Sequence, residues 1–154
     1  MPGLSKQHLV RSLACTLVIG SLVVMGAPEL TSLAAASPQQ VMREYKGVRL
    51  GMKSEEVQAA LGKPENKSEA SEEYKLSGDD TLTVHYDSGL VKALMFYYSD
   101  AKNAPPWKDV VGNAEVKVNE NGSKFARVEV SAEKFWVLMY QNKTGTTTTI
   151  TISR

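Results

Sequence analysis

Histidine is the side chain that changes its protonation state near neutral pH, and this chain has two, His8 and His85. His8 lies in the expected leader, so His85 is the one histidine of the chain after cleavage. One imidazole does not build a multi-histidine metal site, and a zinc site here would need mostly carboxylate ligands. A small hydrolase using His85 with a serine and an acid stays open as an alternative, although the sequence contains no nucleophile-elbow motif. We prefer to interpret His85 as a solvated residue on the polar face of a strand.

The acidic residues have structural interpretations. Asp79 and Asp80 follow Ser77-Gly78 directly before an expected strand, where turn formation explains them. The other acidic residues of interest are assigned to a helix dipole or to surface charge: Glu55, Glu56, Glu72, Glu73 and Glu120. A Gly-rich phosphate loop is also missing from the sequence. We therefore predict no catalytic residue, no cofactor and no metal.

Two expected strands carry more aromatic side chains than a half-buried sheet needs. Residues 90–98 and 134–140 have apolar side chains on both alternating faces, whereas a sheet covered on one side usually has a polar second face. One explanation is that other parts of the chain cover both faces. The other is an exposed aromatic platform for a partner, since Trp and Tyr concentrate binding energy at interfaces. The expected anchors of this platform are Phe96, Tyr98, Trp136, Leu138 and Tyr140.

The clearest helix signal lies in residues 54–61. Ser54 is expected to cap the helix, and Gly62 and Pro64 are expected to end it. Apolar residues follow Val57 at i+3 and i+4, so they share one face. A helix of about two turns is marginal alone, so we expect it to pack on a sheet.

Alternating apolar and polar residues predict the strands of that sheet, with turns at 87–89, 119–122 and 142–145 and a helical turn at 107–111. The expected strands are 74–76, 81–86, 90–98, 114–118, 124–130, 134–141 and 146–153. The predicted class is α+β, with short helices packed on an antiparallel β-sheet. Residues 81–89 resemble 135–145, which suggests two tandem helix-plus-three-strand units, 47–100 and 105–154, unless any two hairpins look alike at this level.

The first 36 residues have the layout of a secretory signal peptide. A mildly basic stretch precedes the uncharged run Leu13–Gly26, and Ala34–Ala36 supply the small residues of a cleavage site. The run is shorter than the roughly 20 residues that span a bilayer, and an uncleaved signal anchor is the alternative. Residues 37–46 are expected to be a linker or mobile arm before an α+β domain over 47–154.

Removal of this leader would also remove Cys15, the one cysteine of the chain. Cys15 precedes most of the apolar run, so we do not predict a lipoprotein site there. The remaining chain could form no disulfide, and its acidic and basic residues would balance, which gives no electrostatic signature for nucleic acid or an anionic membrane. We expect a periplasmic or extracellular protein with no membrane span after signal cleavage.

Part of the sequence resembles the SmpA/OmlA (BamE-like) family and is similar to the repeat unit of β-lactamase inhibitor proteins. The matching residues, within 47–98, are Leu50-Gly51-Met52, Val57, Leu61-Gly62-Lys63-Pro64, Tyr86-Asp87-Ser88-Gly89 and Val91. The resemblance implies a short helical element on a small antiparallel sheet, in an exported protein without enzymatic activity that holds another protein. This chain differs from the BamE-like pattern in lacking a convincing lipoprotein box and in extending well past one unit.

The predicted function is therefore that of a non-catalytic protein-binding module, whose partner is another envelope or secreted protein. Two alternatives remain: a small periplasmic hydrolase using His85, and a carrier of a small apolar ligand between sheet and helices.

Overall fold

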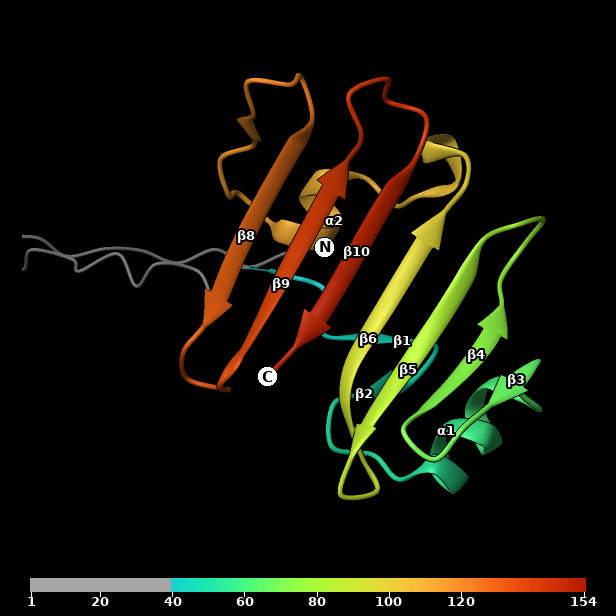
Figure 1. Cartoon of the computed structure of the whole chain (residues 1–154). Coiled ribbons are helices and arrows are strands. Elements are labelled where there is room, and N and C mark those ends of the chain that lie inside the picture. The colour runs from blue at the N-terminus through green and yellow to red at the C-terminus, as the bar shows by residue number, and fades with distance from the viewer. Residues whose placement is uncertain (1–39) are drawn as a thin grey trace, which may run out of the picture. The chain divides into compact units, whose positions relative to one another are not determined.

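An eight-stranded antiparallel sheet forms one layer of the protein in the computed structural model, which describes residues 40–154 (Figure 1). The strand order is β3-β4-β5-β6-β10-β9-β8-β7, so β6 and β10 lie at the centre. The strands are β3 (Asn66–Lys67), β4 (Ser71–Lys75), β5 (Thr81–Asp87), β6 (Leu90–Tyr98), β7 (Lys117–Val118), β8 (Lys124–Val130), β9 (Phe135–Gln141) and β10 (Thr148–Ser153). The sheet fits the expected α+β class, although strands dominate.

The second layer consists of short elements that cover one face of the sheet. They are the hairpin of β1 (Glu44–Tyr45) and β2 (Val48–Arg49), the helices α1 (Ser54–Leu61) and α2 (Trp107–Val111), and the 3₁₀ turn η1 (Ala101–Asn103). In Figure 1 the hairpin and α2 lie behind the sheet. Pro106 precedes α2 and Gly112 ends it, and the helix occupies the residues 107–111 expected from the sequence.

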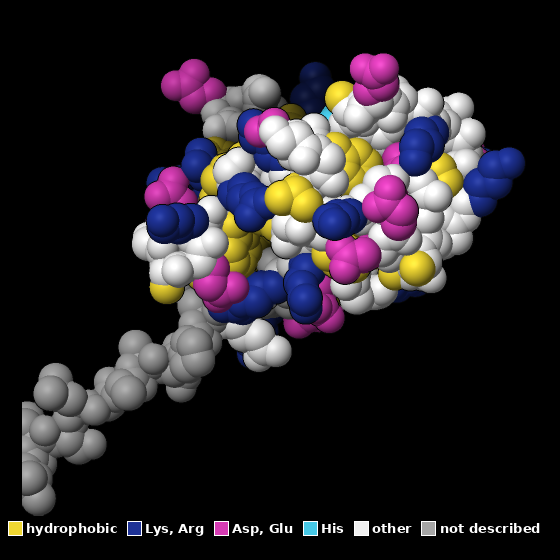
Figure 2. Space-filling view, turned by 90° about the horizontal axis from the view of Figure 1, so that it is seen from below, with side chains coloured by type: hydrophobic (Ala, Val, Ile, Leu, Met, Phe, Trp, Pro, Cys, Tyr) yellow, Lys and Arg dark blue, Asp and Glu magenta, His cyan; other side chains and the backbone are white. Residues whose placement is uncertain are grey.

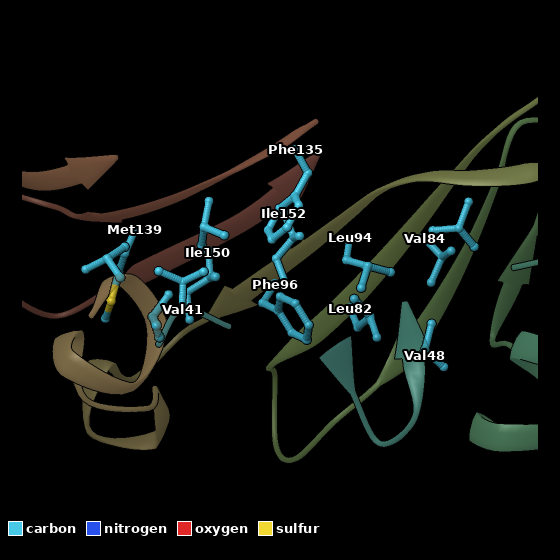
Figure 3. Close-up of a cluster of buried hydrophobic side chains, with 14 of the residues drawn as sticks. Val41, Val48, Leu82, Val84, Leu94, Phe96, Phe135, Met139, Ile150 and Ile152 are labelled. Carbon is cyan, nitrogen blue, oxygen red and sulfur yellow. The ribbon is translucent and has the colours of Figure 1, made fainter. Parts of the chain in front are cut away.

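The core lies between these two layers. Alternate side chains of the central strands, such as Leu94, Phe96 and Ile150, have no exposed surface. They point toward the second layer, and Val41 and Val48 contribute to the same cluster from that side (Figure 3). The buried positions of the strands therefore show which face of the sheet the second layer covers.

Helix α1 ends at the predicted residue but begins one residue earlier than the predicted cap allows. Lys53, rather than Ser54, occupies the N-cap position, and its backbone N–H donates to the Glu56 carboxylate over 2.8 Å. Ser54 is the first helical residue, and its hydroxyl donates a hydrogen bond to the Glu72 carboxylate instead of capping the helix. Gly62, with φ of 86°, ends the helix by a backbone conformation that favours glycine.

A β-bulge between β5 and β6 changes which side chains of β6 face the core. The two strands are joined by a turn in which Ser88 and Gly89 both have positive φ, as a two-residue type I′ hairpin requires. The register then shifts between His85 and Tyr86, whose partners are Ala93 and Val91, so that Lys92 is the extra residue. As a consequence Val91 is buried together with the residues of opposite parity further along β6.

The predicted linker is wrong for residues 41–46, which belong to the second layer. Val41 is buried, the Met42 backbone N–H donates to the Val110 carbonyl over 2.9 Å, and Tyr45 pairs with Val48 in the hairpin. The apolar side chains of Val41, Met42 and Tyr45 thus pack this segment against the core. The predicted signal peptide and residues 37–39 of the predicted arm lie outside the described residues.

Candidate functional site

The sheet has an open face, opposite the second layer, which no element between residues 40 and 154 covers. Side chains alternate across a strand, so the residues between the buried positions of the central strands face this side. The open face is formed by Thr81, Thr83, His85, Ala93, Met95, Tyr97, Phe125, Arg127, Glu129, Trp136, Leu138, Tyr140, Thr149, Thr151 and Ser153.

The register gathers apolar side chains at the centre of the open face. Tyr97 and Tyr140 are the cross-strand partners of Thr149 on its two sides, so the two tyrosines lie about 10 Å apart along one row. Met95 and Leu138 flank Thr151 in the next row. Tyr97 is 45%, Met95 40% and Tyr140 37% exposed, although they lie in the middle of a sheet. The centre of the open face is therefore accessible apolar surface.

Trp136 adjoins this centre beside charged side chains. The Arg127 guanidinium lies 4.7 Å from the centroid of the Trp136 ring, within the range of a cation–π contact. Arg127 also forms a 3.0 Å ion pair with Glu129, the cross-strand partner of Trp136. An apolar centre with a polar border is the usual composition of a protein–protein contact surface.

Phe96 and Tyr98 do not belong to the open face, which corrects two of the five expected anchors. They are 0% and 6% exposed and stack on each other in the core, with ring centroids 6.4 Å apart. Tyr45 meets the Phe96 ring edge-on at 5.2 Å. Burial, with smaller contributions from Tyr45 and Asp80, raises the pKa of Tyr98 to about 12. Trp136, Leu138 and Tyr140 do face outward, and the residues that the expectation missed are Met95 and Tyr97.

His85 lies at one end of the open face, next to a serine but without a catalytic arrangement around it. Ser71 is its cross-strand partner on β4. The Ser71 hydroxyl lies 3.0 Å from that of Ser68, and no hydrogen bond between Ser71 and His85 is present within residues 40–154. The hydrolase alternative therefore lacks an organised nucleophile at this position.

A buried carboxylate, Glu72, joins α1 to the edge of the sheet, although the sequence indicated a surface charge. Its side chain is 1% exposed. One oxygen accepts hydrogen bonds from Ser54 Oγ at 2.7 Å, Lys67 Nζ at 2.7 Å and Gln58 Nε2. The other oxygen accepts hydrogen bonds from the hydroxyls of two tyrosines, Tyr74 and Tyr86. Glu72 thus connects α1, β3, β4 and β5.

The hydroxyls of Tyr74 and Tyr86 donate to Glu72 Oε2 over 2.7 and 2.6 Å. Burial and the adjacent carboxylate raise the pKa of both phenols, so they remain donors at neutral pH. Lys67 Nζ also donates to Ser54 Oγ over 3.1 Å. Lys67 Nζ is therefore the donor in its contacts with both Ser54 and Glu72, and does not act as a base toward Ser54. This hydrogen-bonded cluster therefore has a structural role, which is to hold α1 against the edge of the sheet.

The hydrogen bonds at Glu72 predict a loss of stability in acid. Burial alone would raise the pKa of this carboxyl, but donation from Lys67, Tyr86, Ser54 and Tyr74 lowers it from 4.5 to about 2. Because the pKa of Glu72 is depressed in the folded state, the ionised carboxylate contributes fully to the free energy of unfolding above pH 4.5, and this contribution disappears as the pH falls toward 2. The contribution amounts to about 3 kcal/mol. Urea unfolding at a series of pH values between these limits should detect the loss, and an unchanged midpoint would contradict it.

Charged side chains of both signs are intermixed on the surface seen in Figure 2, with apolar areas between them. No helix in the described part of the chain is long and apolar enough to cross a membrane. Within residues 40–154 no three His, Cys, Asp or Glu side chains gather as a metal site would require. Comparisons with protein-family models, curated proteins and solved structures found no match. The class of this protein therefore follows from its architecture alone. It is a two-layer α+β domain with an accessible, partly apolar sheet face.

Proposed function

We propose that this protein is an exported, non-catalytic module that binds another envelope or secreted protein through its open face, in the periplasm or outside the cell. The observation that carries the proposal is the exposure of Tyr97, Met95 and Tyr140 at the centre of the sheet. Single exposed apolar residues are common on soluble proteins, but neighbouring ones on a rigid surface mark interaction sites.

The form of the surface favours a protein as the ligand. Extended strands present tyrosine and tryptophan rings with little loss of side-chain entropy on binding, because these rings have only two rotatable bonds. Small ligands, in contrast, are held in concave cavities. The ion pair of Arg127 and Glu129 at the border provides polar groups that select orientation more than they add affinity.

The strand order also supports the proposal of two tandem units, 47–100 and 105–154. Each half has a short helix followed by a meander of three longer strands, β4-β5-β6 after α1 and β8-β9-β10 after α2. The two meanders meet where β6 pairs with β10, so a single open face spans both. The resemblance to SmpA/OmlA (BamE-like) proteins and to the β-lactamase inhibitor repeat is part of the same proposal, because those families hold other proteins.

The test is capture of a partner by the full chain. Tagged full-length protein is produced in its own cells, cross-linked, and recovered from the envelope and the medium, and each bound protein is then purified and its affinity measured. Tyr97→Ala/Tyr140→Ala is expected to weaken that affinity by about tenfold or more, because it removes the two most exposed rings of the centre.

Val116→Ala/Val118→Ala is the matched control, because both valines are exposed apolar residues outside the open face. It should leave the affinity within about twofold. Equal affinity of the wild type and the tyrosine double variant for every captured protein would overturn the proposal. A hydrolytic activity abolished by His85→Ala would instead favour the enzyme alternative.

A further inference from the structure

A cavity of about 540 Å³ lies on the covered side of the sheet, away from the open face. Its apolar wall comes from the hairpin segment, the end of β4, the end of β6 and the segment after η1: Met42, Tyr45, Leu76, Tyr98 and Pro105. Asp80, Asn103 and Ser77 complete the lining. This volume is within the range of small-molecule sites, which combine a mostly apolar lining with a few polar groups.

Asp80 gives the cavity a buried negative charge. Its side chain is 1% exposed. Oδ1 accepts from the Ser99 backbone N–H at 2.7 Å and from Ser99 Oγ at 2.9 Å, and Oδ2 accepts from Asn103 Nδ2 at 2.8 Å. Burial alone would raise the pKa of Asp80, but these donors lower it, so the group is ionised at neutral pH.

All the donors to Asp80 are neutral, and within residues 40–154 no lysine or arginine forms an ion pair with it. This contrasts with Glu72, whose carboxylate is paired with Lys67. Buried charges are normally paired, because leaving water is costly for an ion without a counter-ion. The cavity next to Asp80 is where a positive group could approach it.

The aromatic lining of the cavity is suited to the same charge. The faces of tyrosine rings attract cations, and Tyr45 and Tyr98 both contribute to the wall. Both rings are held by Phe96, which stacks on Tyr98 and meets Tyr45 edge-on. Tyr45 already lies 5.4 Å from the Lys46 ammonium, so a ring of this wall makes a cation contact within the chain.

We propose that this cavity binds a small organic cation, an alkyl or aralkyl amine, with its ammonium group toward Asp80 and its apolar body against Tyr45 and Leu76. The site is independent of the proposed function, since it lies on the other side of the sheet from the open face. Occupancy should therefore leave the affinity for a protein partner unchanged.

Calorimetric titration of the full chain with phenethylamine and with phenethyl alcohol tests the proposal. The two probes differ only in their ammonium and hydroxyl groups, and the amine is expected to bind about tenfold or more tightly. Asp80→Asn should abolish the preference for the amine. Asp79→Asn, the same change at the exposed neighbouring residue, should retain it.

Leu76→Trp is a second variant, which fills the cavity without altering Asp80 and should weaken both probes. It keeps the test decisive if Asp80→Asn does not fold, as judged by circular dichroism. Equal affinity for the two probes, no binding up to their solubility, or a preference that survives in Asp80→Asn would overturn the proposal. Probe-induced NMR shifts at Tyr97 and Tyr140 of the open face instead of Tyr98 would also overturn it.

Discussion

Phe96→Ala is expected to lower the free energy of unfolding by about 3–5 kcal/mol, the range measured when a large aromatic side chain is removed from a packed core. Phe96 has no exposed surface and contacts the rings of Tyr45 and Tyr98. Its loss would leave a void between the centre of the sheet and the hairpin of the second layer. Chemical unfolding followed by tryptophan fluorescence measures the change directly.

Tyr97→Ala is the matched control, because the change removes an aromatic ring from the next residue of the same strand. Tyr97 is 45% exposed on the open face, so its loss should cost less than about 1 kcal/mol. The contrast between the two variants tests which face of β6 is covered. Similar losses in both, or a larger loss for Tyr97→Ala, would contradict the assignment of the two faces.

Local signals in the sequence were sufficient to predict the helices and most of the longer strands. The i, i+3, i+4 spacing from Val57, with glycine after Leu61, located α1 and its end, and the helical turn expected over 107–111 has the bounds of α2. These signals act within a few residues, so they survive in any fold. The strand order, in contrast, depends on pairing between β6 and β10, which are far apart in the chain and carry no local mark of each other.

The two misassigned anchors have one local cause. Both parities of β6 are apolar, so the pattern alone does not identify the covered face. The bulge beside His85 then buries Val91 together with Phe96 and Tyr98, which a regular strand would place on the opposite face. On β9, which has no such shift, Trp136 and Tyr140 face outward, as the platform hypothesis required.

The buried carboxylates were missed for a different reason. Glu72 and Asp80 each have an acidic neighbour in the sequence and lie beside polar segments, so composition indicated surface and turn residues. Their burial depends on donors that come from other elements, such as Ser54 in α1 and Asn103 in η1. One signal was present: Glu72 alternates with Tyr74 on the parity that faces the core.

Glu72→Gln is expected to lower the free energy of unfolding by about 2–4 kcal/mol at neutral pH, because hydrogen bonds to a charged acceptor contribute more than neutral ones. Glutamine keeps the size of the side chain but has only one acceptor oxygen. Its NH₂ group is a hydrogen-bond donor, and it would be placed against groups that are donors themselves, such as the hydroxyls of Ser54, Tyr74 and Tyr86. The ion pair with Lys67 would also be lost.

Glu73→Gln is the control for this variant, since Glu73 is the next residue of β4 and its side chain points to the opposite side of the strand. Within residues 40–154 its carboxylate accepts one hydrogen bond, from Asn66 over 3.2 Å at the surface, so the change should cost within about 0.5 kcal/mol. Glu72→Gln should also flatten the acid dependence of stability between pH 4.5 and 2, because the group with the depressed pKa is gone. If Glu72→Gln unfolds like the wild type in urea at neutral pH, Glu72 does not hold α1 to the edge of the sheet.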